Sequence, residues 1–348
     1  MSCAPFDNNE IATSAMLDEL FSKNHKLGYS LWICVSRDGQ PLWLAPATAQ
    51  GARNLYNIVR PMRLKVRLAL RSILFFSILF PRIATIIFGR RWCNAPLLTD
   101  FLNQGCLRSV SGMICGPVGP RRRLTMFCRD GQDRSIIIKV GVNVGGSAAC
   151  ELESSALKEL SLVDGWRHRI PRLLSSGDWR GRKWIAQSEI KGCQLGVDNI
   201  NDLEGLWEEM PRTGSVKLSE WLMLRAVPNG HCLQQLRERL LDSPLSSQEL
   251  RCGWIHGDYA PWNAIRATDR EIHLIDLEYA TKDQPVLIDL WYLRFSAAHL
   301  LGRDLPIGKE RIIGLALVVF WIFDHAAEPV WRAALNMINE ELTILDKG

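Results

Sequence analysis

Residues 254–265 read WIHGDYAPWNAI, and residues 273–278 read HLIDLE. Their polar members lie at the ends of short apolar runs that we expect to be strands: His256, Asp258, Asn263 and Asp276. This spacing suits phosphoryl transfer, in which one carboxylate orients or deprotonates an acceptor hydroxyl. An amide oxygen five residues later and a second carboxylate beyond the next hairpin are ligands of the kind that Mg²⁺ prefers. The stretch therefore predicts a site for phosphoryl transfer.

The run HGDYAPWN followed by IDLE resembles the aminoglycoside phosphotransferase and choline kinase-like family, which comprises small-molecule kinases with a protein-kinase-like fold. The resemblance implies that Asp258 is the catalytic base and that Asn263 and Asp276 bind the metal. It also implies that His256 braces the catalytic loop. The other interpretation is that His256 and Asp258 cap a turn and that Asp276 ends a strand. Four positions in register favour the kinase interpretation.

The same resemblance implies an α+β, bilobal protein-kinase-like fold with a β-rich N-lobe and a mainly helical C-lobe. We expect an N-terminal extension over residues 1–104, the N-lobe over 105–190 and the C-lobe, with its acceptor pocket, over 191–348. The extension is expected to contain a helix (11–27), a hairpin (31–44) and a basic amphipathic helix (60–80). In the C-lobe, helical periodicity covers residues 218–227, 232–241, 312–323 and 330–345.

Lys139 follows an apolar run at residues 136–138. In the kinases that the chain resembles, an inward-pointing lysine at this place reaches the nucleotide phosphates and pairs with a helix glutamate. The spacing of the leucines that follow favours Glu153 as that glutamate, with Glu151 as the alternative. Taken alone, such a lysine is more typical of a solvated strand end, but the downstream motif favours the functional interpretation.

Gly116 and Gly119 bound a turn between two predicted strands, at residues 109–114 and 124–128. A glycine turn in this place lets backbone N–H groups approach a phosphate, and the three arginines at 121–123 follow it directly. The alternative is a plain hairpin with solvated arginines. The sequence leaves both interpretations open.

Residues 188–192 resemble the hinge between the two lobes of a kinase. There the backbone, more than the side chains, would bind adenine, so no sequence signature for the base is expected. We assign Ser188 and Ile190 to the nucleotide, with Ile190 packed against the base. The implied cofactors are ATP, or another nucleoside triphosphate, and Mg²⁺.

The net charge of +5 is unevenly distributed. Residues 39–129 contain fourteen Lys and Arg against one acid, a net charge of +13, which leaves −8 for the rest of the chain. Arg60, Arg63, Arg67 and Arg71 fall on one face of the predicted helix, beside an apolar surface. This pattern is typical of an interfacial membrane helix. A helix packed on the kinase core with its arginines in water is the favoured interpretation, because soluble proteins contain many such helices.

The composition, 47% hydrophobic and 23% charged, is that of an ordinary globular protein. No apolar run reaches the roughly 18 to 20 residues that a membrane span needs, and the polar start of the chain shows no secretory signal. The ten cysteines form no Cys-x-x-Cys pair or His/Cys cluster, which argues against a zinc site and a disulfide framework. We therefore expect a cytoplasmic protein, or one peripheral to the inner face of a membrane.

These observations predict an ATP/Mg-dependent phosphotransferase that moves the γ-phosphate to a hydroxyl of a sugar, an amino alcohol or an aminoglycoside-like molecule. A small-molecule acceptor, and no nucleic acid, is the expected partner. The alternative is a catalytically silent nucleotide-binding scaffold, docked on a membrane through residues 60–80. The presence of Asp258, Asn263 and Asp276 together favours the enzyme, whereas nothing in the sequence selects the acceptor or the oligomeric state.

Overall fold

The computed structural model describes residues 29–37, 40–46, 72, 75, 79, 89–93, 107–116, 119–225, 227, 232–301, 305, 308–323, 334–339 and 342–343. Contacts within the chain divide it into two units. The β-rich unit comprises residues 1–155 and 172–189, and the helical unit comprises residues 156–171 and 190–348. Each unit is described by itself.

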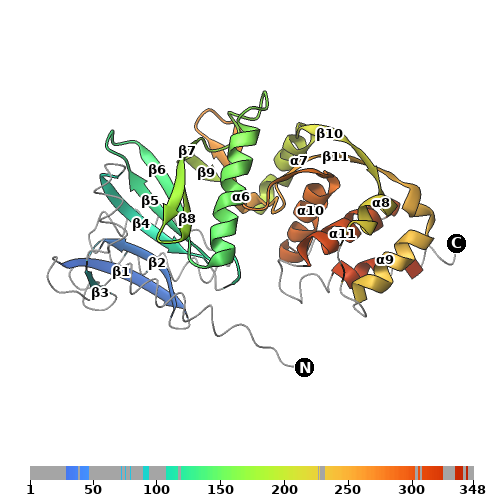
Figure 1. The fold of residues 1–348 in the computed structure, drawn as a ribbon, viewed down its shortest axis with the longest axis horizontal. Coiled ribbons are helices and arrows are strands. Elements are labelled where there is room, and N and C mark those ends of the chain that lie inside the picture. The colour runs from blue at the N-terminus through green and yellow to red at the C-terminus, as the bar shows by residue number, and fades with distance from the viewer. Residues whose placement is uncertain are drawn as a thin grey trace. The chain divides into compact units, whose positions relative to one another are not determined.

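The β-rich unit contains an eight-stranded antiparallel sheet with the strand order β3-β1-β2-β4-β5-β6-β8-β7 (Figure 1). Its strands are β1 (Tyr29–Arg37), β2 (Gln40–Pro46), β3 (Gly89–Cys93), β4 (Ser109–Cys115), β5 (Arg123–Arg129), β6 (Ser135–Gly141), β7 (Leu173–Trp179) and β8 (Arg182–Ser188). Helix α6 (Val144–Leu160) follows β6 in the chain. The predicted β-rich N-lobe is thus confirmed, including its strands around the glycine turn.

The predicted N-terminal hairpin is confirmed as β1 and β2, which pair up to Arg37 and Gln40; its turn residues lie outside the described part of the chain. The sequence did not predict β3, which pairs with β1. Because β2 pairs with β4, strands from both sides of the predicted boundary at 104/105 share one sheet. The three-part division of the chain stays a prediction.

The two helices predicted in the N-terminal extension fall largely outside the described residues. Residues 11–27, where the first of these helices was predicted, lie entirely outside the described part of the chain. Within 60–80, Ser72, Phe75 and Leu79 are helical, and the four arginines of the predicted stripe are not described.

Buried and more accessible side chains alternate along β5 and β6, and the buried ones form part of the core of the β-rich unit. Leu124, Met126 and Ile138 are at most 1% exposed, and their neighbours on the other face are more accessible. Burying one such side chain contributes roughly 1.5 to 3 kcal/mol to folding. The core cluster consists of Leu107, Met113, Cys115, Leu124, Met126, Cys128, Ile136, Ile138, Val140, Val142, Trp179 and Ala186.

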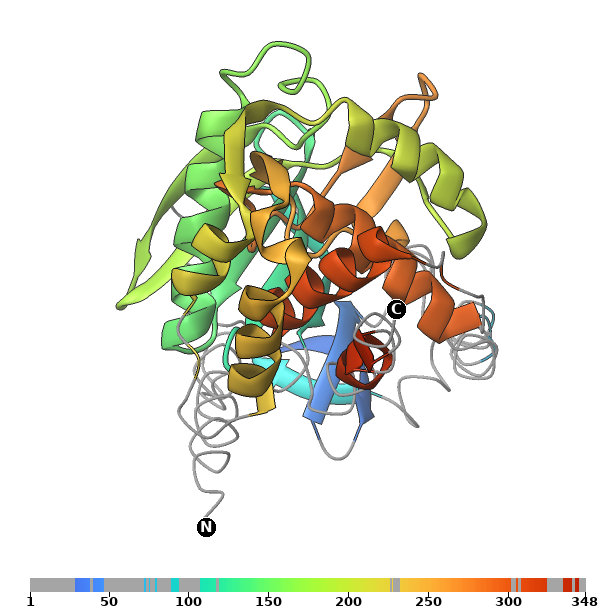
Figure 2. The same ribbon diagram turned by 90° about the vertical axis from the view of Figure 1, so that its right-hand side faces the viewer.

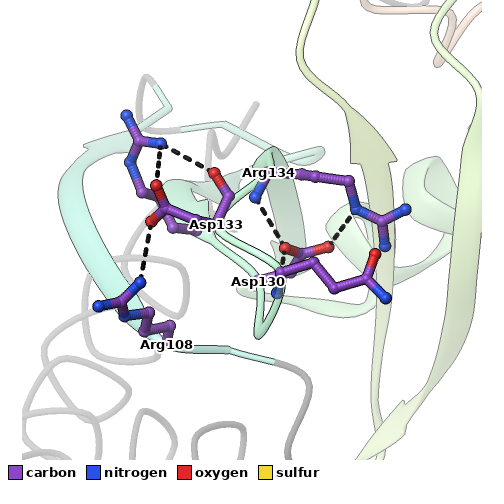
Figure 3. Close-up of polar contacts among 6 residues, drawn as sticks. Arg108, Asp130, Asp133 and Arg134 are labelled. Carbon is purple, nitrogen blue, oxygen red and sulfur yellow. Dashed lines mark hydrogen bonds and ion pairs between the residues drawn. The ribbon is translucent and has the colours of Figure 1, made fainter.

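A tight connection at Asp130-Gly131 joins β5 and β6, and its geometry depends on Asp130 (Figure 3). The carboxylate accepts hydrogen bonds from the backbone N–H of Gln132 at 2.9 Å and of Arg134 at 2.8 Å. It also accepts one from Nε of Arg134 at 2.8 Å. An aspartate that bonds the backbone of its own turn in this way fixes the turn. Burial raises the pKa of the Asp130 carboxyl, but these bonds and the Arg134 charge outweigh burial, so the pKa is lowered.

Five helices with described bounds lie entirely within the helical unit, and Figure 2 turns them toward the viewer. They are α7 (Ile200–Glu208), α8 (Leu218–Met223), α9 (Cys232–Asp242), α10 (Leu287–Leu301) and α11 (Lys309–Ile322). The mainly helical C-lobe, and with it the α+β kinase-like fold class, is confirmed. In α11 residues 312–320 and 322 are all buried, whichever side of the helix they face, as its apolar composition predicts. Of the predicted helix at 330–345, residues 334–339 and 342–343 are helical and the others lie outside the description.

Two small antiparallel sheets in the helical unit carry the loops of the candidate site. One has the order β10-β11-β14, formed by β10 (Arg212–Lys217), β11 (Glu249–Ile255) and β14 (Thr281–Pro285). The other has the order β13-β12-β9, formed by β9 (Gly192–Gln194), β12 (Ala264–Ala267) and β13 (Ile272–Leu274). Residues 193–252 thus contain strand β10 and most of β11 besides the helices α7, α8 and α9, and the helical periodicity of this segment did not predict β10. Strand β10 is polar and mostly exposed, so it lacks the apolar alternation that identifies a strand.

Within the described residues, no helix combines the length and the apolar character that crossing a bilayer requires. Most of the cysteines whose burial is described, including Cys115, Cys128, Cys150 and Cys252, are buried. Burial raises the pKa of the Cys128 thiol to about 12, which keeps it protonated and unreactive near neutral pH.

We predict that Asp130→Ala lowers the melting temperature by about 2 to 4 °C, because two backbone amides lose their acceptor. Asp133→Asn is the matched control, since its contacts with Arg108 at 3.4 Å and Arg129 at 3.2 Å are exposed and such pairs contribute little. Because the pKa of Asp130 is lowered in the folded chain, its contribution is present above pH ~4 and is lost as the pH falls through the folded pKa. Equal melting temperatures for the two variants, measured by thermal denaturation at pH 7, would contradict this role.

Candidate active site

In the β-rich unit, Lys139 on β6 and Glu153 on α6 form a buried ion pair. Nζ of Lys139 lies 2.5 Å from Oε1 of Glu153, and the two side chains are 7% and 0% exposed. The predicted partner is therefore confirmed. The alternative, Glu151, instead lies 3.4 Å from Lys183 at the surface. A lysine held in this way is placed as the kinase resemblance implies, and its contact with phosphate stays a prediction.

A second cation on Glu153 was missed by the sequence analysis. Nη1 of Arg123, at the start of β5, donates to Oε2 of Glu153 at 2.6 Å. Arg122 and Arg123 are only 2% and 8% exposed, so of the two alternatives that the sequence left open, the one with solvated arginines does not describe these two residues. The signal that could have found Arg123 is strand register, because Thr125 pairs with Lys139 and Arg123 lies two residues before it on the same face.

The glycine turn is attached to the beginning of helix α6. Gly116 donates its N–H to the Arg123 carbonyl at 2.9 Å, which closes the hairpin. Nδ2 of Asn143 donates to the Gly119 carbonyl at 3.1 Å, and Oδ1 of Asn143 accepts the N–H of Gly146 at 2.7 Å. The two residues inside the turn lie outside the description. Phosphate binding by Gly116 and Gly119 stays a prediction.

Ser188 ends β8, where its hydroxyl accepts the N–H of Arg172 at 2.9 Å and its N–H donates to the Arg172 carbonyl at 2.9 Å. Its side chain therefore fixes the strand that leads to the predicted hinge. Ile190 is half-buried. The assignment of both residues to the nucleotide stays a prediction.

In the helical unit, the catalytic loop leaves β11 and is held by a carboxylate outside the motif. Asp289 on α10 is fully buried and accepts the N–H of His256 at 2.5 Å and that of Gly257 at 2.9 Å. These contacts make Asp289 a structural brace of the catalytic loop. Gly257 has φ +79°, and a Cβ there would lie 2.7 Å from Cβ of Tyr279, so the position requires glycine.

His256 connects the loop to the strand end that carries Asp276. Its Nε2 lies 2.8 Å from the Ile275 carbonyl, and the N–H of Asp258 lies 3.3 Å from its Nδ1. Both contacts are satisfied when the proton is on Nε2 and Nδ1 accepts. The predicted bracing geometry of His256 is thus present. The residue is 1% exposed, which fits a structural role better than a catalytic one.

Asn263 and Asp258 face each other directly. Nδ2 of Asn263 donates to Oδ2 of Asp258 at 2.8 Å and to its carbonyl at 2.9 Å. The Asn263 carbonyl accepts the N–H of Ile275 at 2.9 Å, which fixes the backbone directly before Asp276. Because these two side-chain bonds use the amide nitrogen of Asn263, its Oδ1 is the atom suited to a cation. The donor set of amide and carboxylate oxygens fits Mg²⁺.

Burial and nearby charges shift two pKa values in this part of the site. Burial raises the pKa of Asp289 to about 6, although its interactions with His256 and Gly257 lower it in part. Burial also raises the pKa of Tyr292 on α10, and the charge of Asp258 and a hydrogen bond with it raise it further. Sequence reasoning missed Tyr292. Its neighbour Trp291 is 1% exposed and belongs to the core.

Within the β-rich unit the structure pairs Lys139 with Glu153, and within the helical unit it joins His256, Asp258 and Asn263. Lys139, Glu153, Gly116, Gly119 and Ser188 belong to the β-rich unit, and His256, Asp258, Asn263, Asp276 and Ile190 belong to the helical unit.

A family model described as the phosphotransferase enzyme family matches residues 161–307, which include the whole catalytic loop and Asp289. The match covers less than half of the chain, and over these residues the chain is similar to that family. The resemblance inferred from the motif is therefore confirmed, and the chain is a phosphotransferase enzyme. Among curated proteins, none matches the sequence.

Several solved structures resemble the phosphotransferase at low similarity. A type VIII aminoglycoside-3'-phosphotransferase is 19% identical and covers 65% of this chain and 91% of its own, with a TM-score of 0.37. Aminoglycoside phosphotransferase APH(3'')-Id from Streptomyces rimosus is 17% identical, with 71% and 96% covered and a TM-score of 0.39. A putative fructosamine-3-kinase from Haemophilus somnus is 9% identical, with 67% and 92% covered and a TM-score of 0.42. At TM-scores below 0.5, these likenesses carry no argument about this chain.

We predict that Asp289 makes the stability of the phosphotransferase depend on pH. Its pKa of about 6 in the folded chain lies above the ordinary value of 3.8, so the folded chain binds the proton more tightly. This contribution is fully present below pH ~4 and is lost as the pH rises through the folded pKa. Relative to Asp289→Asn, the free energy of unfolding of the wild type should fall by about 3 kcal/mol between pH 4 and 7.

Urea denaturation at a series of pH values measures this difference. The matched control is Asp242→Asn, which changes an exposed aspartate at the end of α9 and should follow the wild-type pH dependence. Parallel pH curves for wild type and Asp289→Asn would show that Asp289 has an ordinary pKa.

Proposed function

We propose that this phosphotransferase transfers the γ-phosphoryl group of ATP, with Mg²⁺, to a hydroxyl group of a small molecule. The observation that carries the proposal is the arrangement of Asp258, Asn263 and Ile275. Nδ2 of Asn263 holds the Asp258 carboxylate at 2.8 Å, and the backbone of Asn263 fixes the residue before Asp276. One loop thus presents a carboxylate for the acceptor and two oxygen donors for a cation.

In this proposal each residue has a separate part. Asp258 orients the acceptor hydroxyl and takes its proton late in the transfer. Asn263 and Asp276 hold Mg²⁺, which when bound neutralises charge on the phosphates. Lys139 binds the nucleotide phosphates, and Glu153 holds Lys139 in position. Positioning and charge neutralisation, and not covalent chemistry on the chain, supply the rate enhancement.

We leave the acceptor as a class: a sugar, an amino alcohol or an aminoglycoside-like molecule with a free hydroxyl. The described side chains around the catalytic loop do not select among them. A screen of a metabolite library for ATP-dependent mass gain of one phosphate identifies the acceptor directly.

We predict that Asp258→Asn lowers kcat by roughly 10²- to 10⁴-fold, because the proton acceptor is lost while an oxygen remains for Asn263. Binding of Mg·ATP, followed with a fluorescent ATP analogue, should stay within about threefold of wild type. The matched control is the exposed Asp242→Asn, which should leave both quantities unchanged. Full phosphoryl transfer by Asp258→Asn would remove the assigned base and the proposal with it.

A second candidate, peripheral docking on an anionic membrane through residues 60–80, is supported by one observation. Phe75 and Leu79 are 57% and 54% exposed, which is unusual for large apolar side chains on one helix. The catalytic and the silent-scaffold alternatives are both compatible with such docking. Measured turnover of ATP decides between them.

We predict that replacing Arg63, Arg67 and Arg71 by Gln weakens co-sedimentation with phosphatidylserine vesicles, by roughly 1 kcal/mol for each charge removed. The control replaces three exposed arginines of other segments, Arg108, Arg129 and Arg167, and should have little effect. If the two triple variants sediment alike, residues 60–80 do not dock on the membrane.

A further inference from the structure

Arg123 and Lys139 are two cations held on one carboxylate. Because β5 and β6 pair with Thr125 opposite Lys139 and Arg123 opposite Gly141, Arg123 and Lys139 are diagonal neighbours on one face of the sheet. Like charges at this separation repel each other unless an anion lies between them. Glu153 supplies that anion, with Oε2 at 2.6 Å from Arg123 and Oε1 at 2.5 Å from Lys139.

We propose that Arg123 is a positioning residue that keeps Glu153 and helix α6 in place without help from Lys139, and thereby leaves the Lys139 ammonium available to nucleotide phosphate. The part concerning the nucleotide rests on the function proposed above. The part concerning Glu153 and α6 rests on the geometry of the β-rich unit alone.

The first argument is the electrostatics of burial. Glu153 has no exposed surface, and a buried carboxylate that loses all its cations is strongly destabilising. In a pair with lysine alone, the carboxylate would be left without a cation whenever the lysine turned toward phosphate. Here Arg123 occupies the other oxygen, and its planar guanidinium, itself only 9% exposed, stays charged at any relevant pH. Movement of the Lys139 ammonium therefore leaves Glu153 neutralised.

The second argument is the way in which the first turn of α6 is fixed. A Cβ on Gly145 would lie 2.1 Å from the Pro120 carbonyl oxygen, and one on Gly146 would lie 2.0 Å from that of Arg122. Only glycine allows this approach of the helix to the segment that leads into β5. Asn143 closes the same contact with its two hydrogen bonds. The segment that presents Arg123 and the helix that presents Glu153 are thus packed backbone to backbone.

A single lysine–glutamate pair would have to hold helix α6 and bind the nucleotide phosphate at the same time. Here Arg123, Asn143 and the two glycines hold α6, and Lys139 binds the phosphate. We infer that α6 keeps the same position with and without nucleotide.

A double-mutant cycle in urea denaturation tests the structural part without any ligand. Lys139→Met should raise the unfolding equilibrium constant by less than roughly tenfold, because Arg123 still neutralises Glu153. Adding Arg123→Met should raise it by roughly 100-fold more than the product of the two single effects. Adding Glu153→Gln to that double variant should reverse most of the loss, since no charge remains to be neutralised. Multiplicative single effects would overturn the proposal.

Nucleotide binding tests the other part. With a fluorescent ATP analogue and Mg²⁺, Arg123→Met should weaken binding roughly tenfold, because Glu153 then holds Lys139 as its only cation. Arg123→Lys should restore binding to within about threefold. Arg129→Met, which removes an exposed arginine at the other end of the same strand, should bind like wild type. If Arg123→Met also binds like wild type, Arg123 does not act on Lys139.

Hydrogen exchange of the α6 amides completes the test and separates the two proposals. Protection in wild type should be the same with and without Mg·ATP and should fall in Arg123→Met. A ligand-induced rise of α6 protection in wild type would overturn the inference that α6 is fixed. If wild type binds no nucleotide, the proposed function fails, while the denaturation cycle still decides whether Arg123 holds Glu153.

Discussion

Two carboxylates with no exposed surface hold residues of the candidate site in place. Glu153 does so within the β-rich unit, and Asp289 does so within the helical unit. A charge removed from water must find donors or cations, because its desolvation cost exceeds the net contribution of most single contacts. Each carboxylate therefore fixes whatever groups satisfy it. For Glu153 these groups are two cationic side chains, and for Asp289 they include two backbone amides of the catalytic loop.

The two solutions have different consequences. The partners of Glu153 are the long side chains of Arg123 and Lys139, and Lys139 is suited to bind a second anion. This carboxylate therefore positions cationic groups that can bind phosphate. The amides that donate to Asp289 belong to His256 and Gly257, the residues directly before Asp258, so this carboxylate fixes backbone direction. Backbone bonds alone do not offset the burial of Asp289, and its pKa is accordingly raised to about 6. Rigidity of the loop is obtained at a cost in stability near neutral pH.

Sequence reasoning found the parts of the site that are local and missed those that depend on register or distant contacts. His256, Asp258 and Asn263 lie within one short loop, so their spacing in the sequence is enough to predict that their side chains lie close together. The Lys139–Glu153 pair was found because an apolar strand and a leucine pattern frame it. Arg123 was not found, because its role depends on which residue of β5 lies diagonal to Lys139, and the strand was expected to begin one residue later. Strand β10 was missed because a polar, exposed strand has no alternation to detect.

Backbone strain at Asp276 indicates how the last predicted ligand is aimed. Asp276 has φ +65°, a left-handed conformation that costs a non-glycine residue of order 1 kcal/mol. The residue before it is held from both sides, because Ile275 donates its N–H to Asn263 at 2.9 Å and accepts from Nε2 of His256 at 2.8 Å. Two hydrogen bonds of ordinary strength are enough to offset that cost. The chain therefore turns sharply directly after Ile275, whose backbone is fixed by His256 and Asn263, the same two residues that contact Asp258.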